Sequence, residues 1–581
     1  MPKIDSDIDP GIGAAAPSSR SFGFNRRVVW GVLLLIVVGV FAFLPVFYVL
    51  VSSFNLALPH QPFKFGLDGW IEVYSNHKTW GSVLVTLILA ARVPIAVVIA
   101  FVLCWLLVRV EIPGRRFIEM MLWFGFFLPG IPMTMGWILL LDSNYGLLNL
   151  AAKKLGADDA IFSISTIPGI MWVHIALTTV PVMVILLAPA FRQFDSAFEE
   201  AAEVSGAGIW RTMRSVTIPL LAPALLTAFV ASFIRSLETF EIEQIIGAPS
   251  GIYVYGTRVY DLVFSDPPRF AQAMAVSALF LIILFALAVP YHMYLMRTQN
   301  QATIAGRGVR LQSGTKPKWV YAASAVVILY VVCTIIVPFG VLIVGSFTRL
   351  FGFFFLKNPW TVSHWTTVLT DERFFSAATT SVLLGIGAGI IGIVIFALLA
   401  WVLVRTDIWG RSIISLLIWL PWAIPGLVLG LTLLSLILTV PALHIFSGTI
   451  APLIFALVLK ELPVGVQLIR ASLTQVSDQL EEAAAVSGAG FMRIFVRVTL
   501  PLIAPTLVAV FLLIFAATIR DISTIVLIAA PGMRTLSLVM FDYAASGRFE
   551  AGAVLGVIVA AISLLMTVIA FRFGMKVGIG R

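Results

Sequence analysis

Several ionisable residues lie within or at the ends of long apolar segments, where charged side chains are costly and often functional. Arg235 and Glu238 are three residues apart, which places them on one helix face, and Glu241 lies one turn further. These charges would either line a polar path and contact a cationic solute, or pair with one another and stabilise the bundle. The candidate path residues are Arg235, Glu238, Glu241, Lys460, Glu461, Arg520 and Asp521.

No pattern typical of an active site accompanies these charges. The sequence contains no G-x-x-x-x-G-K-[ST] phosphate loop, no paired catalytic carboxylates and no nucleophile elbow. Its two cysteines form no zinc-type cluster with histidine. We therefore expect no catalysis, no bound cofactor and no metal centre in this chain.

The composition indicates that membrane helices position these residues. Of the 581 residues, 60% are hydrophobic and 12% are charged, whereas soluble domains carry about 25% charged residues. A helix needs about 20 apolar residues to cross the hydrocarbon core. The sequence predicts an all-α integral membrane fold with twelve transmembrane helices, at 28–52, 80–108, 117–141, 166–190, 218–246, 270–296, 319–345, 376–404, 412–440, 449–469, 500–529 and 551–574.

The chain also contains an internal repeat. Residues 199–223 and 481–505 are identical at 16 of 25 positions without a gap. Each half has six predicted helices, so both halves enter the membrane in the same sense and form parallel repeats. The expected parts are a disordered cytosolic tail (1–27), a first transmembrane half (28–297), a cytosolic linker (298–318) and a second transmembrane half (319–581).

The basic residues predict the orientation. Arginines gather in short loops between apolar segments, for example at Arg109, Arg115 and Arg116 and again at Arg405 and Arg411. The positive-inside rule then places both termini in the cytoplasm. The net charge of +9 is therefore interpreted as a sign of membrane topology and not of nucleic-acid binding.

The repeated block between the fourth and fifth helices of each half predicts a short helix at the membrane surface. Two glutamates at its start favour the helix dipole. Two alanines give a small surface that another protein could approach closely. A glycine then interrupts the helix, and Pro219 opens the next membrane helix, where its missing N–H costs little.

This block resembles the EAA loop of binding-protein-dependent ABC importer permeases: Glu-Ala-Ala, three residues, Gly, nine residues, an aliphatic residue, one residue, an aliphatic residue, Pro. In that family the loop is the coupling helix that docks into a groove of the ATPase subunit. The resemblance implies an ATPase-coupling role for Glu199, Glu200, Ala201, Ala202, Gly206, Pro219, Glu481, Glu482, Ala483, Ala484, Gly488 and Pro501.

The stretch LETFEIEQIIGAPSGIYVYGTRVY from Leu237 and the two-half layout resemble the ferric-iron branch of these permeases. That branch includes thiamine, polyamine-type and phosphonate importers. The resemblance implies a multi-pass permease of the type I importer fold in the bacterial inner membrane, with ferric iron or a small charged solute as substrate. It implies two cytosolic ATPase subunits that bind ATP-Mg, and a periplasmic or lipid-anchored substrate-binding protein.

One alternative is a twelve-helix secondary transporter driven by an ion gradient. Such transporters also contain parallel six-helix halves. The doubled Glu-Ala-Ala loop argues against this alternative, because an ion-driven transporter has no ATPase to dock.

Overall fold

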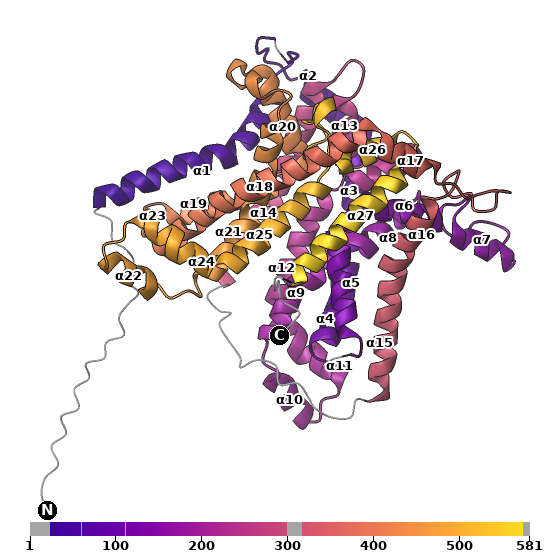
Figure 1. Ribbon diagram of the computed structural model, residues 1–581, viewed down its shortest axis with the longest axis horizontal. Helices are drawn as coiled ribbons and strands as arrows, with labels where there is room; N and C mark the ends of the chain where they lie inside the picture. The colour runs from indigo at the N-terminus through magenta and orange to yellow at the C-terminus, as the bar shows by residue number, and fades with distance from the viewer. Residues whose placement is uncertain (1–23, 60, 111, 299–316, 573–581) are drawn as a thin grey trace, which may run out of the picture.

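The computed structural model describes residues 24–59, 61–110, 112–298 and 317–572 (Figure 1). Within these ranges every regular element is a helix, apart from two isolated β-bridges in loops, Asn55 with Phe65 and Thr348 with Trp360. The predicted all-α membrane fold is therefore confirmed. Most of the expected tail and linker, residues 1–23 and 299–316, lies outside the described residues.

In the described ranges, nine helical segments are long and apolar enough to cross a membrane, and the number rises to twelve if each of three bent helix pairs counts as one span. Each of the twelve overlaps one predicted helix. Short π-helical turns join the parts of some spans. The continuous spans are formed by α1 (Phe24–Ser52), α3 (His77–Ala90) with α4 (Arg92–Val108), α8 (Ile167–His174) with α9 (Val180–Gln193), α11 (Ile209–Thr212) with α12 (Ile218–Leu237), α14 (Phe270–Thr298), α15 (Lys318–Val331) with α16 (Val337–Gly345), α18 (Glu372–Arg405), α21 (Ala451–Leu473) and α27 (Phe549–Arg572).

The third span of each half lies where the sequence predicts a helix, over 117–141 and 412–440, but it is sharply bent, which the apolar pattern did not predict. The bends measure 106° and 97°. Both bends fall at a Pro-Gly pair that occupies the same place in each half. Pro129 and Pro425 have ψ angles of 148° and 138°, which are not helical. Proline lacks an N–H and disfavours a helical conformation in the residue before it. The bent pairs are α5 (Arg115–Phe127) with α6 (Gly130–Leu141), and α19 (Arg411–Trp419) with α20 (Gly426–Thr439).

The fifth spans end earlier than the sequence predicts. The expected helices run to residues 246 and 529, whereas α12 ends at Leu237 and α25 (Ala504–Arg520) ends at Arg520. Each helix stops directly before a carboxylate, Glu238 or Asp521, although the sequence beyond remains largely apolar. The second of these spans also bends by 77° at Ile503, just before Pro505.

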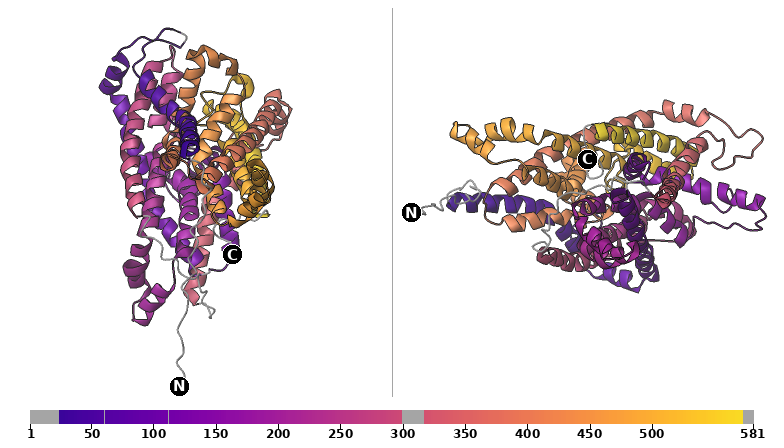
Figure 2. Two further views of the ribbon diagram at one scale, coloured as in Figure 1. Left: turned by 90° about the vertical axis from the view of Figure 1, so that its left-hand side faces the viewer. Right: turned by 90° about the horizontal axis from the view of Figure 1, so that it is seen from below.

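The first span of each half packs against the third span of the other half. In the first half α1 lies beside α19 and α20, and in the second half α15 and α16 lie beside α5 and α6 (Figure 1). Figure 2 shows the two halves side by side along this shared boundary. The helices approach closely, since a Cβ atom at Gly136 of α6 would lie 2.2 Å from the Pro338 carbonyl oxygen of α16. One core therefore joins both halves.

This close approach can be tested with two alanine substitutions. Gly136→Ala should lower the thermal unfolding midpoint of the purified protein, because overpacking against a backbone carbonyl costs about 1–3 kcal/mol. Gly340→Ala is the matched control, since a Cβ atom there meets nothing within 4 Å. Equal midpoints for both variants would contradict the packing of α6 on α16.

Candidate functional site

The repeated block forms the same short helix in both halves, α10 (Ala197–Val204) and α22 (Gln479–Val486). Each helix begins two residues before the first glutamate of its block. Both glutamates of the block therefore lie in the first turn, where the helix dipole stabilises negative charge. In Figure 1 the two helices lie at the ends of separate arms, α22 on the left beside α23 and α10 at the bottom beside α11.

A glycine ends each of these helices in a left-handed conformation. Gly206 and Gly488 both have a φ of 81°, which residues with a side chain adopt only with strain. The N–H of Ala207 donates to the Ala202 carbonyl at 3.0 Å, and the same bond from Ala489 to Ala484 measures 3.1 Å. This is the hydrogen-bond pattern of a Schellman motif, in which glycine fixes the direction of the chain after the helix.

The first glutamate of each block is directed into the protein. Glu199 accepts a hydrogen bond of 2.6 Å from the buried hydroxyl of Thr217, and Glu481 accepts one of 2.8 Å from Thr499. These threonines close the π-helical turns η2 (Met213–Thr217) and η9 (Phe495–Thr499), at the start of the fifth spans. The resemblance assigned Glu199 and Glu481 to the surface that contacts the ATPase. In the structure their carboxylates instead accept hydrogen bonds from threonines of the same chain.

An arginine completes each contact. Arg109 Nε lies 3.4 Å from Glu199 Oε2, and its Nη2 donates to the Phe194 carbonyl at 2.7 Å. Arg405 Nε lies 3.5 Å from Glu481, and its Nη2 donates to the Leu473 and Val476 carbonyls. Each arginine therefore connects the end of the second span, the end of the fourth span and the short helix. We call these two contacts the arginine clamps.

Burial affects the guanidinium of the first clamp. It lowers the pKa of Arg109 below its usual range, while the carboxylates of Glu199, Asp195 and Glu200 act in the opposite direction. A buried cation needs opposite charge and hydrogen-bond acceptors close by, and Glu199 with the Phe194 carbonyl supplies both.

Pro219 and Pro501, the prolines of the two repeated blocks, lie within the fifth spans and not at their first residues. The fifth span begins at Ile209, about two turns before the predicted start at residue 218. Pro219 follows η2, whose last hydrogen bond runs from the Ile218 N–H to the Met213 carbonyl. Pro501 holds the same place after η9, in α24 (Leu500–Leu502). The π-helical turn accommodates the proline, which has no N–H to place in the helix.

The two loops expose several apolar side chains next to charged ones such as Glu203 and Arg211. Val204 and Val486, the last residues of α10 and α22, are each 90% exposed, and Trp210 is 77% exposed. Ala201 and Ala483 are also exposed. Exposed apolar patches of this kind typically mark an interaction surface.

The charged residues predicted for a path form a second cluster, at the ends of the fifth spans. The expected pair on one helix face is confirmed, with Arg235 3.7 Å from Glu238. Lys460 Nζ lies 2.6 Å from Asp521 and 3.0 Å from the Thr524 hydroxyl. Arg520 donates to the Phe126 carbonyl and stacks over the Phe126 ring, so it connects the second half to the first.

The remaining two carboxylates belong to the same cluster. Glu241 lies within electrostatic reach of Asp521, Lys460 and Arg520, and Glu461 lies within reach of Arg520. The structure therefore brings all seven predicted residues together. We call this group the charged cluster.

Both bends of the third spans reach the charged cluster. A Cβ atom at Gly130 would lie 3.7 Å from Glu241 Oε2, and one at Gly426 would lie 3.1 Å from Lys460 Nζ. The bends therefore place small, backbone-exposing residues against charged side chains of both halves. Among the described residues, no group of three or more His, Cys, Asp or Glu side chains could hold a metal ion.

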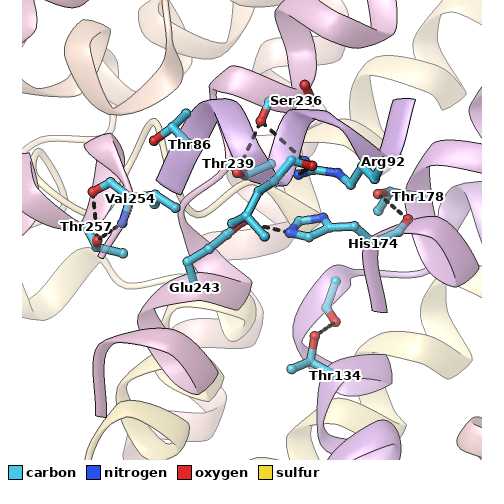
Figure 3. Close-up of polar contacts among 12 residues, drawn as sticks. Thr86, Arg92, Thr134, His174, Thr178, Ser236, Thr239, Glu243, Val254 and Thr257 are labelled. Atoms are coloured by element: carbon cyan, nitrogen blue, oxygen red, sulfur yellow. Dashed lines mark hydrogen bonds and ion pairs between the residues drawn. The ribbon is translucent and has the colours of Figure 1, made fainter. Parts of the chain in front are cut away.

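The sequence analysis assigned no role to three further ionisable residues, which are buried in the first half. Arg92 at the start of α4, His174 at the end of α8 and Glu243 in the turn η3 (Glu243–Gly247) are at most 3% exposed. His174 Nε2 lies 2.8 Å from Glu243 Oε1, as Figure 3 shows. We call these residues the buried trio. The sequence could have indicated them, because each is an ionisable residue in an apolar segment and the equivalent position of the other half is apolar.

The arginine clamp of the first half generates a local prediction. Arg109→Gln should accelerate backbone hydrogen exchange over residues 195–217 about tenfold, because losing a hydrogen bond to a charged group costs about 1.5–3 kcal/mol. Arg211→Gln, an exposed arginine of the same loop, is the control. Equal protection in both variants would show that the clamp does not hold α10.

Known proteins that resemble this chain are transport permeases. Residues 389–577 match the family model described as binding-protein-dependent transport system inner membrane component. A ferric transport system permease protein of Actinobacillus pleuropneumoniae is 24% identical over 400 residues, which cover 68% of this chain and 56% of that protein. A putative ferric transport system permease protein of Haemophilus influenzae is also matched over 56% of its length, at 25% identity over 62% of this chain.

A third relative matches from end to end. An Fe(3+)-transport system permease protein of Haemophilus influenzae is 23% identical over 539 residues, which cover 91% of this chain and 95% of that protein. The names of these relatives agree with the expectation of a non-catalytic membrane subunit. The second half of the chain thus matches the inner membrane component of binding-protein-dependent transport systems, and the chain as a whole resembles two-half permeases of this kind.

Proposed function

We propose that this chain is the membrane permease of an ATP-driven ABC importer in a bacterial inner membrane. The observation that carries the proposal is the doubled short helix, held by the same clamp and ended by the same left-handed glycine in both halves. An importer permease needs two such docking elements, one for each ATPase subunit. The similarity to permease proteins of transport systems supports the same conclusion.

In this proposal the outward faces of α10 and α22 dock onto two cytosolic ATPase subunits, which bind and hydrolyse ATP-Mg. Ala201 and Ala483 permit close approach, and the exposed apolar residues Val204, Trp210 and Val486 supply the contact area. The clamps connect each docking helix to the ends of the second and fourth spans and the start of the fifth. Movement of an ATPase subunit would therefore move these elements together.

The translocation path runs between the halves, past the charged cluster. Ionisable residues in a membrane protein usually face the bundle interior or a water-filled cavity. Arg520 and Phe126 connect the two halves at this level, and the bends of both third spans meet it. Glu238 and Glu241 are half-buried and belong to the one segment of the cluster that is rich in carboxylates.

We propose ferric iron as the substrate, on the strength of the relatives' names and the carboxylates beside the path. Ferric iron favours hard oxygen ligands such as glutamate. A periplasmic or lipid-anchored binding protein would select and deliver it. In this arrangement the carboxylates of the path contact the ion in passing. The arginine-rich loops support a cytoplasmic location for both termini.

The left-handed glycines give a sharp test of the docking helices. Gly206→Val should weaken co-purification with the ATPase subunits and abolish substrate uptake, because valine at a φ of 81° costs about 1–3 kcal/mol and redirects α10. Gly208→Val is the matched control two residues away. It has an extended backbone, with φ −72° and ψ 163°, and equally open surroundings.

The same comparison applies in the second half, with Gly488→Val against Gly490→Val. Expression level and monodispersity verify that each variant is inserted and folded. Full uptake and normal ATPase binding in Gly206→Val and Gly488→Val would remove the main support for an importer.

The path can be mapped with cysteine substitutions. Glu238→Cys and Glu241→Cys should react with a membrane-impermeant thiol reagent in at least one nucleotide state, because a water-filled path exposes them. Val98→Cys, 64% exposed on the outer surface of α4, should be protected because lipid covers that position. Protection of both glutamate positions in every state, with and without ATP, would exclude this route.

A further inference from the structure

The buried trio connects both ends of the segment that carries Glu238 and Glu241 to other helices of the first half. At one end, Arg92 Nη2 donates to the Ser236 carbonyl at 3.3 Å, while its Nη1 donates to the Leu89 carbonyl at 2.8 Å. At the other end, Glu243 binds His174 of α8. Figure 3 shows these contacts side by side, with Ser236 and Glu243 in the same field. Residues 236–243 are therefore connected to two different spans of their own half.

The second half has no such trio. At the offsets of the internal repeat, the positions of Arg92, His174 and Glu243 correspond to Ala388, Ala456 and Ile525, all buried with 0% exposure. An apolar core is thus sufficient to build this region of the fold. Burying three ionisable side chains costs several kcal/mol before their mutual contacts offset it. The trio therefore has a role beyond filling the core.

The equivalent segment of the second half is fixed from the side of the charged cluster. Asp521 accepts a hydrogen bond from the Thr524 N–H at 2.9 Å, and Lys460 bridges Asp521 and the Thr524 hydroxyl. These side chains hold the backbone and one another. In the first half Arg92 and His174 attach the segment to its own half, while Glu241 lies within electrostatic reach of Lys460 and Asp521 of the second half and Glu238 lies 3.7 Å from Arg235.

We propose that Arg92, His174 and Glu243 are positioning residues, which hold the 236–243 segment from behind and thereby direct the Glu238 and Glu241 carboxylates into the path. This inference rests on the proposed function, in which the path runs between the halves. The two halves then have different roles at the path. The first half presents carboxylates to a cation, and the second half supplies a charge-paired wall opposite them.

The experiment uses Glu241→Cys as a reporter in the full chain, with Cys104→Ser and Cys333→Ser, co-expressed with its ATPase subunits in membrane vesicles. The probe is a cationic, membrane-impermeant methanethiosulfonate reagent, and the readout is its rate of reaction. The test variant is Arg92→Met with Glu243→Gln, which removes both charges of the trio at nearly constant volume. We expect its rate to differ about tenfold from that of the reporter alone, since both attachments are weakened.

Two further variants serve as references. Arg92→Lys keeps a cation behind the segment and should retain the rate of the reporter. Thr567→Val removes a buried hydroxyl that bonds only the Ser563 carbonyl of its own helix, far from the trio in sequence, and should also leave the rate unchanged. If the double variant does not fold, Arg92→Ala, His174→Ala and Glu243→Ile together give the first half the residues of the second.

The outcomes separate the two proposals. A reporter that never reacts in the otherwise unchanged chain would overturn the path between the halves. A reporter that reacts equally fast in the parental chain and in a folded trio variant would overturn the positioning role alone. A changed rate in the trio variant, with Arg92→Lys and Thr567→Val at the parental rate, would support it.

Discussion

Each charged side chain among the apolar spans must find an opposite charge or a backbone carbonyl within the protein, because lipid offers neither. This constraint governs both regions described above. Lys460 meets Asp521, Arg520 meets the Phe126 carbonyl, and Arg92 meets the Ser236 carbonyl. The helices bend or end at these places: α12 stops directly before Glu238, and α25 stops directly before Asp521. Backbone carbonyls at these places accept hydrogen bonds from Arg92 and Arg520.

The arginine clamps follow the same rule at the ends of the spans. Arg109 and Arg405 each bind carbonyls at the end of a fourth span, where a helix leaves acceptors without partners. The same guanidinium groups also face the first glutamate of the docking block. A single side chain in each half thus completes a helix end and holds the short helix in place. Two halves that diverge elsewhere have kept this arrangement residue for residue.

The halves differ where a cargo would pass. The first half carries three buried ionisable residues and Glu241, which lies within electrostatic reach of Lys460 and Asp521 across the boundary. The second half pairs Lys460 with Asp521 and has buried apolar residues in place of the trio. The first span of each half packs on the third span of the other half, and this packing joins the two halves in one core. In the proposed function, this duplicated chain keeps a symmetric frame for two similar ATPase subunits and presents unlike surfaces to one substrate.

Much of this could be predicted from the sequence, because the responsible signals are local. Apolar length located the candidate spans, up to twelve in the described residues when each bent pair counts as one, and the repeat indicated two similar halves. The glycine of each repeated block ends its helix as predicted, since left-handed backbone angles favour glycine wherever they occur. The pairing of Arg235 with Glu238 followed from helical spacing alone.

Other features depended on contacts between distant segments. Hydropathy could not reveal that the third spans bend, since residues 117–141 and 412–440 remain apolar across both bends. It could not distinguish Glu199, which binds Arg109 and Thr217, from its exposed neighbour Glu200. The buried trio joins Arg92, His174 and Glu243 from three separate segments. Local sequence determined which residues were available to interact, and only the tertiary structure decided their partners, because partner choice depends on distances between helices that no local pattern encodes.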